Sequence, residues 1–284
     1  MSKSLAVGTV PVRPEELDPA QRATLVKFDS WARFHSGPRQ WPSKPLLAAA
    51  DRYRRSIYVA GCQRSGTTMV TRIIAGADGF RPLALTRDDE LDAALALCGL
   101  IDLPIGSRYA FQTTYLNERY REYAQAPDDA RLIWMIRNPY SVVFSMLHHW
   151  RRAALDRLYS GLSTLSPQRK SGVLGVLLGT ARIEKACSAY ALKTGQVREI
   201  RSWLPPSRLM VVDYDDLIRD PAPWLRAIFE FAETPFRDSY VHAIRSDRRH
   251  LGDRLSGRAQ ALVKELALPV YEECRPLIAD PVKA

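Results

Sequence analysis

Residues 58–74, YVAGCQRSGTTMVTRII, place a glycine-containing turn between two apolar runs. Gly61 and Gly66 have the spacing of a Walker A loop, G-x-x-x-x-G-K-[ST], but Thr67 stands where that motif has its lysine. Arg64 supplies a cation inside the loop instead. Glycines let the backbone turn tightly, so that several N–H groups converge on an anion next to the positive end of the following helix. The stretch therefore predicts an anion-binding loop.

The hydroxyl groups of this loop favour the same interpretation. Ser65, Thr67 and Thr68 follow Arg64 almost without interruption. A turn that only joined a strand to a helix would not need Arg, Ser, Thr and Thr in close succession. Anion binding is therefore preferred to a purely structural turn.

A second cation ends the apolar run RLIWMIRNP, residues 131–139. An arginine at the end of a buried strand is costly unless it is paired, so Arg137 needs a partner. Ser145 lies about two turns into the helix expected after Pro139, where its hydroxyl would face the same sheet edge. Two interpretations stay open: Arg137 and Ser145 bind an anion together, or Arg137 forms a buried ion pair with an acidic side chain.

Buried strands that alternate with helices predict an α/β fold, a parallel β-sheet flanked by helices on both faces. Ligands of such sheets bind at the carboxyl ends of the strands, where the Arg64 loop and Arg137 lie. The apolar runs and helical periodicities indicate strands at 56–61, 131–139 and 208–214, and helices over 66–77, 140–158, 181–204 and 222–232.

The domain organisation follows from proline and polar content. Residues 1–45 are expected to be an N-terminal extension with one helix, over 20–35, capped by Asp18, and 46–284 a single domain. Residues 1–17 are expected to be poorly ordered, because they are rich in proline and polar side chains.

Composition narrows the partners and the location. The 41 Lys and Arg against 31 Asp and Glu give a net charge of +10, which favours an anionic partner without choosing one. Aromatic residues do not interleave with the basic ones, so nucleic acid is not expected. No apolar run is long enough for a membrane span or a signal peptide, which predicts a cytoplasmic protein. The four cysteines are widely spaced and predict neither a zinc site nor a disulfide framework.

Together, QRSGTT and RNPYSVVFS resemble the two signature elements of the sulfotransferase family that uses 3′-phosphoadenosine 5′-phosphosulfate (PAPS). The segment VVDYDDLIRDPAPWLRAIFEFAETPF resembles the next segment of that family, so the likeness covers roughly residues 55–236. It implies a soluble, bacterial-type member with the P-loop NTPase-like sulfotransferase fold. It also implies transfer of a sulfuryl group to a hydroxyl or amine, whose acceptor molecule stays open among a small molecule, a glycan and a peptide. A homodimer is one possible assembly.

The resemblance assigns donor-binding roles by position. The 5′-phosphosulfate would bind to the loop that begins at Gly61, through Arg64, Ser65, Gly66, Thr67 and Thr68. The 3′-phosphate would bind to Arg137 and Ser145. PAPS has one phosphate ahead of its sulfuryl group, so a loop cation and backbone donors suffice and no metal is expected. Arg64 is expected to stabilise the charge that builds on the bridging oxygen, an effect of about 3 kcal/mol for each preorganised donor.

A general base is also expected, because the acceptor must lose a proton. The candidates are acids and histidines of two segments, TRDDELD and SMLHHW: Asp88, Asp89, Glu90, His148 and His149. Glu90 ranks first and Asp89 second among the acids. The alternative for the acids is a helix start, with Thr86 and Asp89 as a capping box.

Alternatives from other classes remain. A P-loop kinase would share the fold, and Asp213 ends a strand that resembles a Walker B strand able to hold magnesium. A non-catalytic nucleotide-binding protein of the same fold is a second alternative, and a nucleic-acid binder is a third. Many members of the sulfotransferase family carry Lys-Thr-Pro before the second motif, whereas this sequence has Gln112 and Thr114 at the first and third of those positions. The basic stretch 246–258 matches the family's closing loop only loosely.

Overall fold

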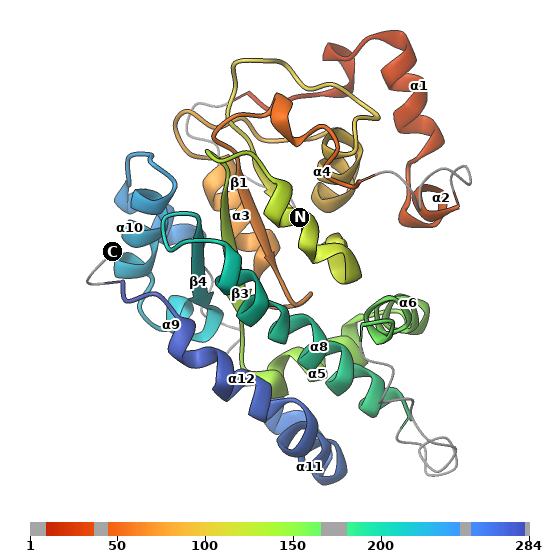
Figure 1. Cartoon of the computed structure of the whole chain (residues 1–284), viewed down its shortest axis with the longest axis vertical. Coiled ribbons are helices and arrows are strands. Elements are labelled where there is room, and N and C mark those ends of the chain that lie inside the picture. The colour runs from red at the N-terminus through yellow and green to blue at the C-terminus, as the bar shows by residue number, and fades with distance from the viewer. Residues whose placement is uncertain (1–9, 37–44, 166–180, 245–250, 282–284) are drawn as a thin grey trace.

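The computed structural model in Figure 1 describes residues 10–36, 45–165, 181–244 and 251–281. Its centre is a sheet of four parallel strands in the order β2-β1-β3-β4. Helices lie on both sides of this sheet, which confirms the predicted α/β fold. The strands are β1 (Ile57–Gly61), β2 (Ala110–Gln112), β3 (Arg131–Ile136) and β4 (Leu209–Asp213).

Strand β2 was not predicted. It has only three residues and pairs with β1 alone, so no run of alternating side chains marks it in the sequence. Its position at the sheet edge comes from pairing with β1, a contact between residues about fifty positions apart. Short strands of this kind depend on a tertiary partner rather than on local propensity.

Successive side chains of the central strands enter two separate cores, as the pleat of a strand requires. Trp134 and Val211 face one core, and Ile133 and Val212 face the other. Helices α5 (Pro139–His149) and α8 (Ala181–Trp203) cover the first face, and α3 (Thr67–Ala75) and α10 (Pro221–Phe231) cover the second. The two apolar faces explain why these strands read as continuous apolar runs.

The remaining elements surround this three-layer centre. The other α-helices are α1 (Pro19–Lys27), α2 (Trp31–His35), α4 (Asp89–Leu97), α6 (Arg152–Ser163), α9 (Tyr214–Arg219), α11 (Gly257–Leu266) and α12 (Leu268–Cys274). The longest 3-10 segment is η4 (Thr114–Gln125), and shorter ones cover Pro14–Glu16, Ala50–Arg52, Asp238–Ala243, Leu251–Arg254 and Arg275–Leu277.

The register places the carboxyl ends of three strands at one level. Gly61 of β1 pairs with Met135 of β3, and Met135 pairs with Val212 of β4. The loops that follow these strands therefore begin side by side. This is how the fold brings together the two motifs that are about seventy residues apart in the chain.

The helix predicted over 140–158 is wrong, because it is interrupted after α5. Trp150 and Arg151 are both extended, with ψ of 141° and 140°, and α6 begins at Arg152. No proline or glycine marks this break. Leu155 and Leu158 of α6 are buried in the first core, so packing of a redirected helix overrides the local helical preference.

The N-terminal region is more ordered than the sequence suggested. The Asp18 carboxylate accepts a hydrogen bond from the backbone N–H of Gln21 at 2.9 Å and caps α1, as predicted. The single helix predicted over 20–35 is instead two helices, because Ser30 starts α2 as a new N-cap. Val12 is fully buried and its N–H donates to the carbonyl of Pro82 at 2.9 Å, so the expected disorder is wrong for residues 10–17. Residues 1–9 lie outside the described part.

Two further features concern the whole described chain. All four cysteines lie in it and are buried, and none is in a disulfide. Among the helices of the described segments, none is both long and apolar enough to cross a bilayer.

We expect Gly61→Ala to be far more destabilising than Gly79→Ala. Both glycines have positive φ, 126° and 80°, which disfavours any other residue. A Cβ at Gly61 would also overlap the carbonyl oxygen of Met135, whereas a Cβ at Gly79 meets nothing within 4 Å. Backbone strain alone costs about 1–2 kcal/mol, and the overlap adds roughly 1–3 kcal/mol. Urea denaturation of both variants measures the difference, and equal losses would show that the β1–β3 approach is not the constraint.

Candidate active site

The predicted anion-binding loop joins β1 to α3. Gly66 is the N-cap of α3 with a left-handed φ of 87°, and a Cβ there would overlap the ring of Tyr214. Arg64 also has a positive φ, 74°, inside the turn. The N–H of Ser65 donates to the carbonyl of Cys62 at 3.1 Å, which closes the turn. Glycine is therefore needed at Gly66 for conformation and for space.

The cations and hydroxyl of the two motifs lie together. The Nε of Arg64 donates to the Oγ of Ser145 at 2.8 Å. The Nη1 of Arg137 donates to the backbone carbonyl of Arg64 at 3.1 Å. Ser145 thus contacts the first motif, not only the arginine eight residues before it.

Arg137 is buried, lies near one acidic side chain and lines a cavity. It is 6% exposed, and its Nε lies 3.9 Å from the Oδ1 of Asp215, at the limit of an ion pair. Its guanidinium also lies 4.3 Å from the ring centroid of Tyr214. The Oδ2 of Asp215 accepts from the N–H of Asn138 at 2.8 Å. Arg137 is therefore held in place by several weak contacts while it lines a cavity.

That cavity has a volume of about 610 Å³ and is rich in cationic and hydroxyl side chains. The predicted donor-binding residues Gly61, Ser65 and Ser145 do not line it, although Ser145 contacts the lining residue Arg64. The buried Oγ of Ser65 has no hydrogen-bond partner in the described structure. Its lining includes Arg64, Gly66, Thr67, Thr68 and Arg137. An anion would complement this set, because guanidinium groups and threonine hydroxyls line the same cavity and can donate hydrogen bonds to it.

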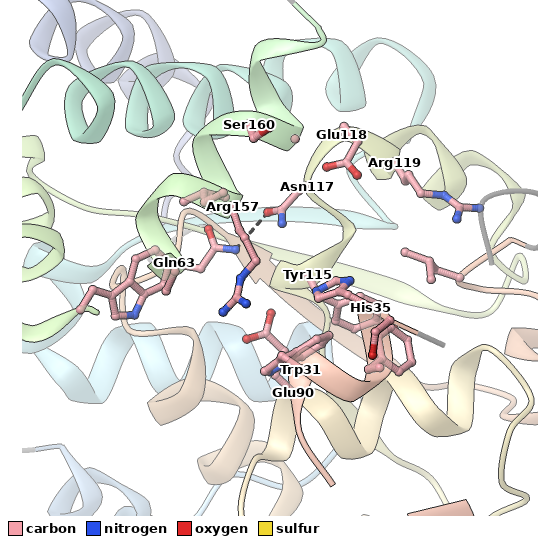
Figure 2. Close-up of a pocket in the computed structure, with 17 residues that line it drawn as sticks. Trp31, His35, Gln63, Glu90, Tyr115, Asn117, Glu118, Arg119, Arg157 and Ser160 are labelled. Atoms are coloured by element: carbon pink, nitrogen blue, oxygen red, sulfur yellow. Dashed lines mark hydrogen bonds between the residues drawn. The ribbon is translucent and has the colours of Figure 1, made fainter. Parts of the chain in front are cut away.

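A larger cavity of about 980 Å³ lies next to the first and is shown in Figure 2. Aromatic side chains of α2 and η4, among them Trp31, Phe34 and Tyr115, form much of its lining. Gln63, Glu90 and Trp150 line both cavities and so form the wall between them. The site therefore has a cationic chamber and an aromatic chamber that meet at a carboxylate.

Glu90 stands in the first turn of α4 and projects into the aromatic cavity in Figure 2. The hydroxyl of Thr114 donates to its carboxylate. Burial raises the pKa of Glu90 to about 7, and the nearby Asp88 adds to this, whereas Thr114 and Lys193 oppose it. A carboxylate with this pKa can accept a proton near neutral pH.

The neighbouring acids Asp88 and Asp89 contact groups of the protein itself. Asp88, not Thr86, is the N-cap of α4, and its carboxylate accepts from the N–H groups of Glu90 at 3.0 Å and Leu91 at 3.2 Å. The capping box predicted for Thr86 and Asp89 is therefore wrong. Asp89 forms an ion pair with Arg72, although it also reaches the cationic cavity.

The two candidate histidines lie elsewhere. His148 and His149 are exposed at the carboxyl end of α5, and His148 packs on the ring of Phe144 with centroids 4.3 Å apart. Neither lines the cationic or the aromatic cavity. They stand in the last turn of α5, where they reach solvent, whereas Ser145 one turn earlier is buried.

A model of the sulfotransferase domain family matches residues 54–250, more than half of the chain. The chain belongs to the sulfotransferase family. A search of the curated proteins found no match. Among solved structures, a sulfotransferase from Alicyclobacillus acidocaldarius is similar at 16% identity and a TM-score of 0.48, over 78% of this chain and 94% of that one.

Two other solved sulfotransferases are similar to this chain. Mouse SULT7A1 complexed with PAP has 15% identity and a TM-score of 0.45, over 79% of this chain and 88% of that one. STF9 from Mycobacterium avium has 13% identity and a TM-score of 0.46, over 90% of this chain and 85% of that one.

Sequence reasoning missed a buried cation in this sulfotransferase. Lys193 of α8 is fully buried, and its Nζ has no hydrogen-bond partner among the described residues. It lies 5.6 Å from the ring centroid of Trp134. Burial lowers the pKa of Lys193 to about 8, while Cys62, Glu90 and Glu118 oppose the shift. No local signal distinguishes it from the other lysine and the arginines of the same helix.

Gln63 was also missed, although it lies inside the quoted loop. Its Nε2 donates to the carbonyl of Thr114 at 3.2 Å and to the Oδ1 of Asn117 at 3.0 Å. These bonds attach the loop to η4, the segment that also holds Glu90 through Thr114. The one sequence feature that could have indicated a role for Gln63 was its position next to Arg64 in the loop.

We expect Lys193→Met to raise the pKa of Glu90 above about 7, because the buried ammonium group favours the ionised carboxylate. Carbon-detected NMR titration of the Glu90 carboxyl measures this directly, and Lys193 stays protonated over most of that range. Lys185→Met is the matched control on the same helix, since Lys185 pairs at the surface with Asp156 at 2.6 Å. An unchanged Glu90 titration in Lys193→Met would contradict the electrostatic coupling.

Proposed function

We propose that this sulfotransferase transfers the sulfuryl group of PAPS to a hydroxyl or amine of an acceptor held in the aromatic cavity. The observation that carries the proposal is the position of Glu90 in the wall shared by the cationic and the aromatic cavities. A donor in one chamber and an acceptor in the other would meet at this carboxylate. Such proximity of reactants to a base is a main source of catalytic rate.

The cationic cavity fits the donor in charge and hydrogen-bonding capacity. The proposed 5′ site is the Arg64 loop, where the buried hydroxyl of Ser65 lacks a partner in the described protein. The proposed 3′-phosphate site is Arg137 with Ser145. The Arg64–Ser145 hydrogen bond joins the two sites, so that both ends of one bisphosphate would contact a connected set of donors.

The proposed chemistry assigns one task to each side chain. PAPS supplies the sulfuryl group and a bisphosphate leaving group. Glu90 takes the proton of the acceptor, and Thr114 holds the carboxylate in place by donating to it. Arg64 stabilises the negative charge on the bridging oxygen of the leaving group. Asp89 is the weaker candidate for the base, because it is paired with Arg72 and does not line the aromatic cavity.

The kinase alternative finds less support at Asp213. Its Oδ2 accepts from the hydroxyl of Tyr271 at 2.6 Å and its Oδ1 from the N–H of Asp215 at 2.7 Å. One oxygen therefore caps α9 and the other binds Tyr271 of α12, whereas a magnesium ligand would need an oxygen directed at the loop. Among the described residues, no cluster of three or more His, Cys, Asp or Glu could hold a metal ion.

Donor binding tests the proposal first. We expect metal-free adenosine 3′,5′-bisphosphate to bind more tightly than ATP with magnesium in titration calorimetry. Arg137→Ala should weaken the bisphosphate by roughly 10- to 100-fold, the effect of a charge-assisted hydrogen bond of about 1.5–3 kcal/mol. Arg219→Ala, which removes an exposed arginine paired with Asp216, should change nothing. A preference for magnesium ATP would move the assignment to the kinase.

The base is tested by the pH dependence of kcat/KM. Glu90 acts when ionised and burial raises its pKa to about 7, so activity should fall as pH decreases through about 7 and level off above it. Glu90→Gln should lower kcat/KM by about 10²- to 10⁴-fold with bisphosphate binding retained. Asp89→Asn is the matched control and should stay within about threefold. Full activity in Glu90→Gln would remove Glu90 from the mechanism.

A further inference from the structure

The aromatic wall of the larger cavity comes from the part of the chain that precedes the family domain. Trp31, Phe34 and His35 of α2 line the cavity, whereas the family match begins at residue 54. The Trp31 ring lies 5.6 Å from that of Tyr115 and 5.4 Å from that of Phe34, measured between centroids. This sulfotransferase therefore uses its own N-terminal helix to build the wall that an acceptor would contact.

The same helix is fixed relative to the proposed base. The indole Nε1 of Trp31 donates to the Oδ2 of Asp88 at 2.9 Å. The Oδ1 of Asp88 accepts from the N–H of Glu90. One carboxylate thus links the aromatic wall to the first turn of α4, so a flat molecule packed on Trp31 would lie at a defined distance from Glu90.

The opposite wall carries an uncompensated cation. Arg157 of α6 is exposed and forms no hydrogen bond or ion pair with any described residue. Figure 2 shows its guanidinium projecting into the cavity in the direction of Glu90. Arg119, the other arginine of this lining, is instead in an ion pair with Glu122 at 2.6 Å.

The carboxylate of Glu118 does not neutralise Arg157. Figure 2 places Glu118 away from the end of the Arg157 side chain, and no ion pair joins them. The Oε2 of Glu118 packs toward the backbone of α6, where a Cβ on Gly161 would come within 2.5 Å of it. Arg157 and Glu118 therefore lie at different sides of the cavity, and Arg157 is the one directed at Glu90.

We propose that the acceptor is a small molecule with a flat, apolar or aromatic body, a hydroxyl group, and an anionic group that pairs with Arg157. The proposal rests on the proposed function. The aromatic rings of α2 and η4 stack on the body, which fits a cavity of about 980 Å³. The planar guanidinium favours a carboxylate or similar group, which it can bind with two parallel hydrogen bonds.

Three naphthols that differ in charge test the acceptor class: 2-naphthol, 6-hydroxy-2-naphthoate and 6-aminomethyl-2-naphthol. With PAPS and the full chain, we expect the naphthoate to have a KM at least tenfold below that of the neutral compound, and the cationic compound to be the poorest. Arg157→Gln should raise the KM of the naphthoate by roughly 10- to 100-fold and leave 2-naphthol within about threefold. Trp31→Ala should raise the KM of all three.

Arg152→Gln is the matched control, because Arg152 is exposed on the same helix but does not line the cavity. A preference for the cationic naphthol, or an unchanged preference for the naphthoate in Arg157→Gln, would overturn the proposal. If no naphthol turns over, calorimetry on protein loaded with adenosine 3′,5′-bisphosphate compares their affinities and decides the acceptor class. Failure to bind the bisphosphate contradicts the proposed function instead, and the same titrations on unloaded protein still decide the acceptor class.

Discussion

The hydrogen bond from Arg137 to the backbone carbonyl of Arg64 holds two cationic side chains at the same edge of a buried sheet. Such groups repel one another, and Arg137 is almost fully removed from water. The strands can bring them together only because β1, β3 and β4 end at one level. The fold therefore holds two positive charges close together, and a bound anion would reduce the repulsion between them. The glycine and the threonine hydroxyls of the Arg64 loop line the same cavity.

Electrostatics also explain why Glu90 differs from the acids beside it. Asp88 and Asp89 keep ordinary helix-start roles, as an N-cap and as a partner of Arg72. Glu90 turns inward between the two cavities, where burial favours its neutral form and the ammonium group of Lys193 partly restores the charged one. Three consecutive carboxylates therefore have three different environments, set by the direction in which the first turn of α4 presents each of them.

The N-terminal helix α2 lines the larger cavity beside this site. Leu25, Phe28 and Phe34 belong to the same core as the main sheet, so α1 and α2 are packed against the family domain. Their position is fixed through Trp31 and Asp88, which are 57 residues apart. A segment in front of the matched family region therefore shapes the larger cavity, whereas the Arg64 loop lies inside that region.

The sequence by itself determined the parts whose signal is local. The apolar runs of β1, β3 and β4, the glycine positions of the Arg64 loop and the Asp18 cap depend on neighbours within a few residues, and the structure has them where they were predicted. The sequence also predicted that the Arg64 loop and Arg137 lie close together, because the carboxyl ends of parallel strands lie at one edge of the sheet.

Only the tertiary structure decided the rest. The three-residue β2 exists through pairing with β1, the break at Trp150 through packing of α6, and the burial of Lys193 through the helices and strands around it. The exposure of His148, the inward turn of Glu90 and the direction of Arg157 depend on how each helix is rotated against its neighbours. Periodicity along one chain reports a residue's own helix or strand, whereas these features are set by contacts between residues far apart in the sequence.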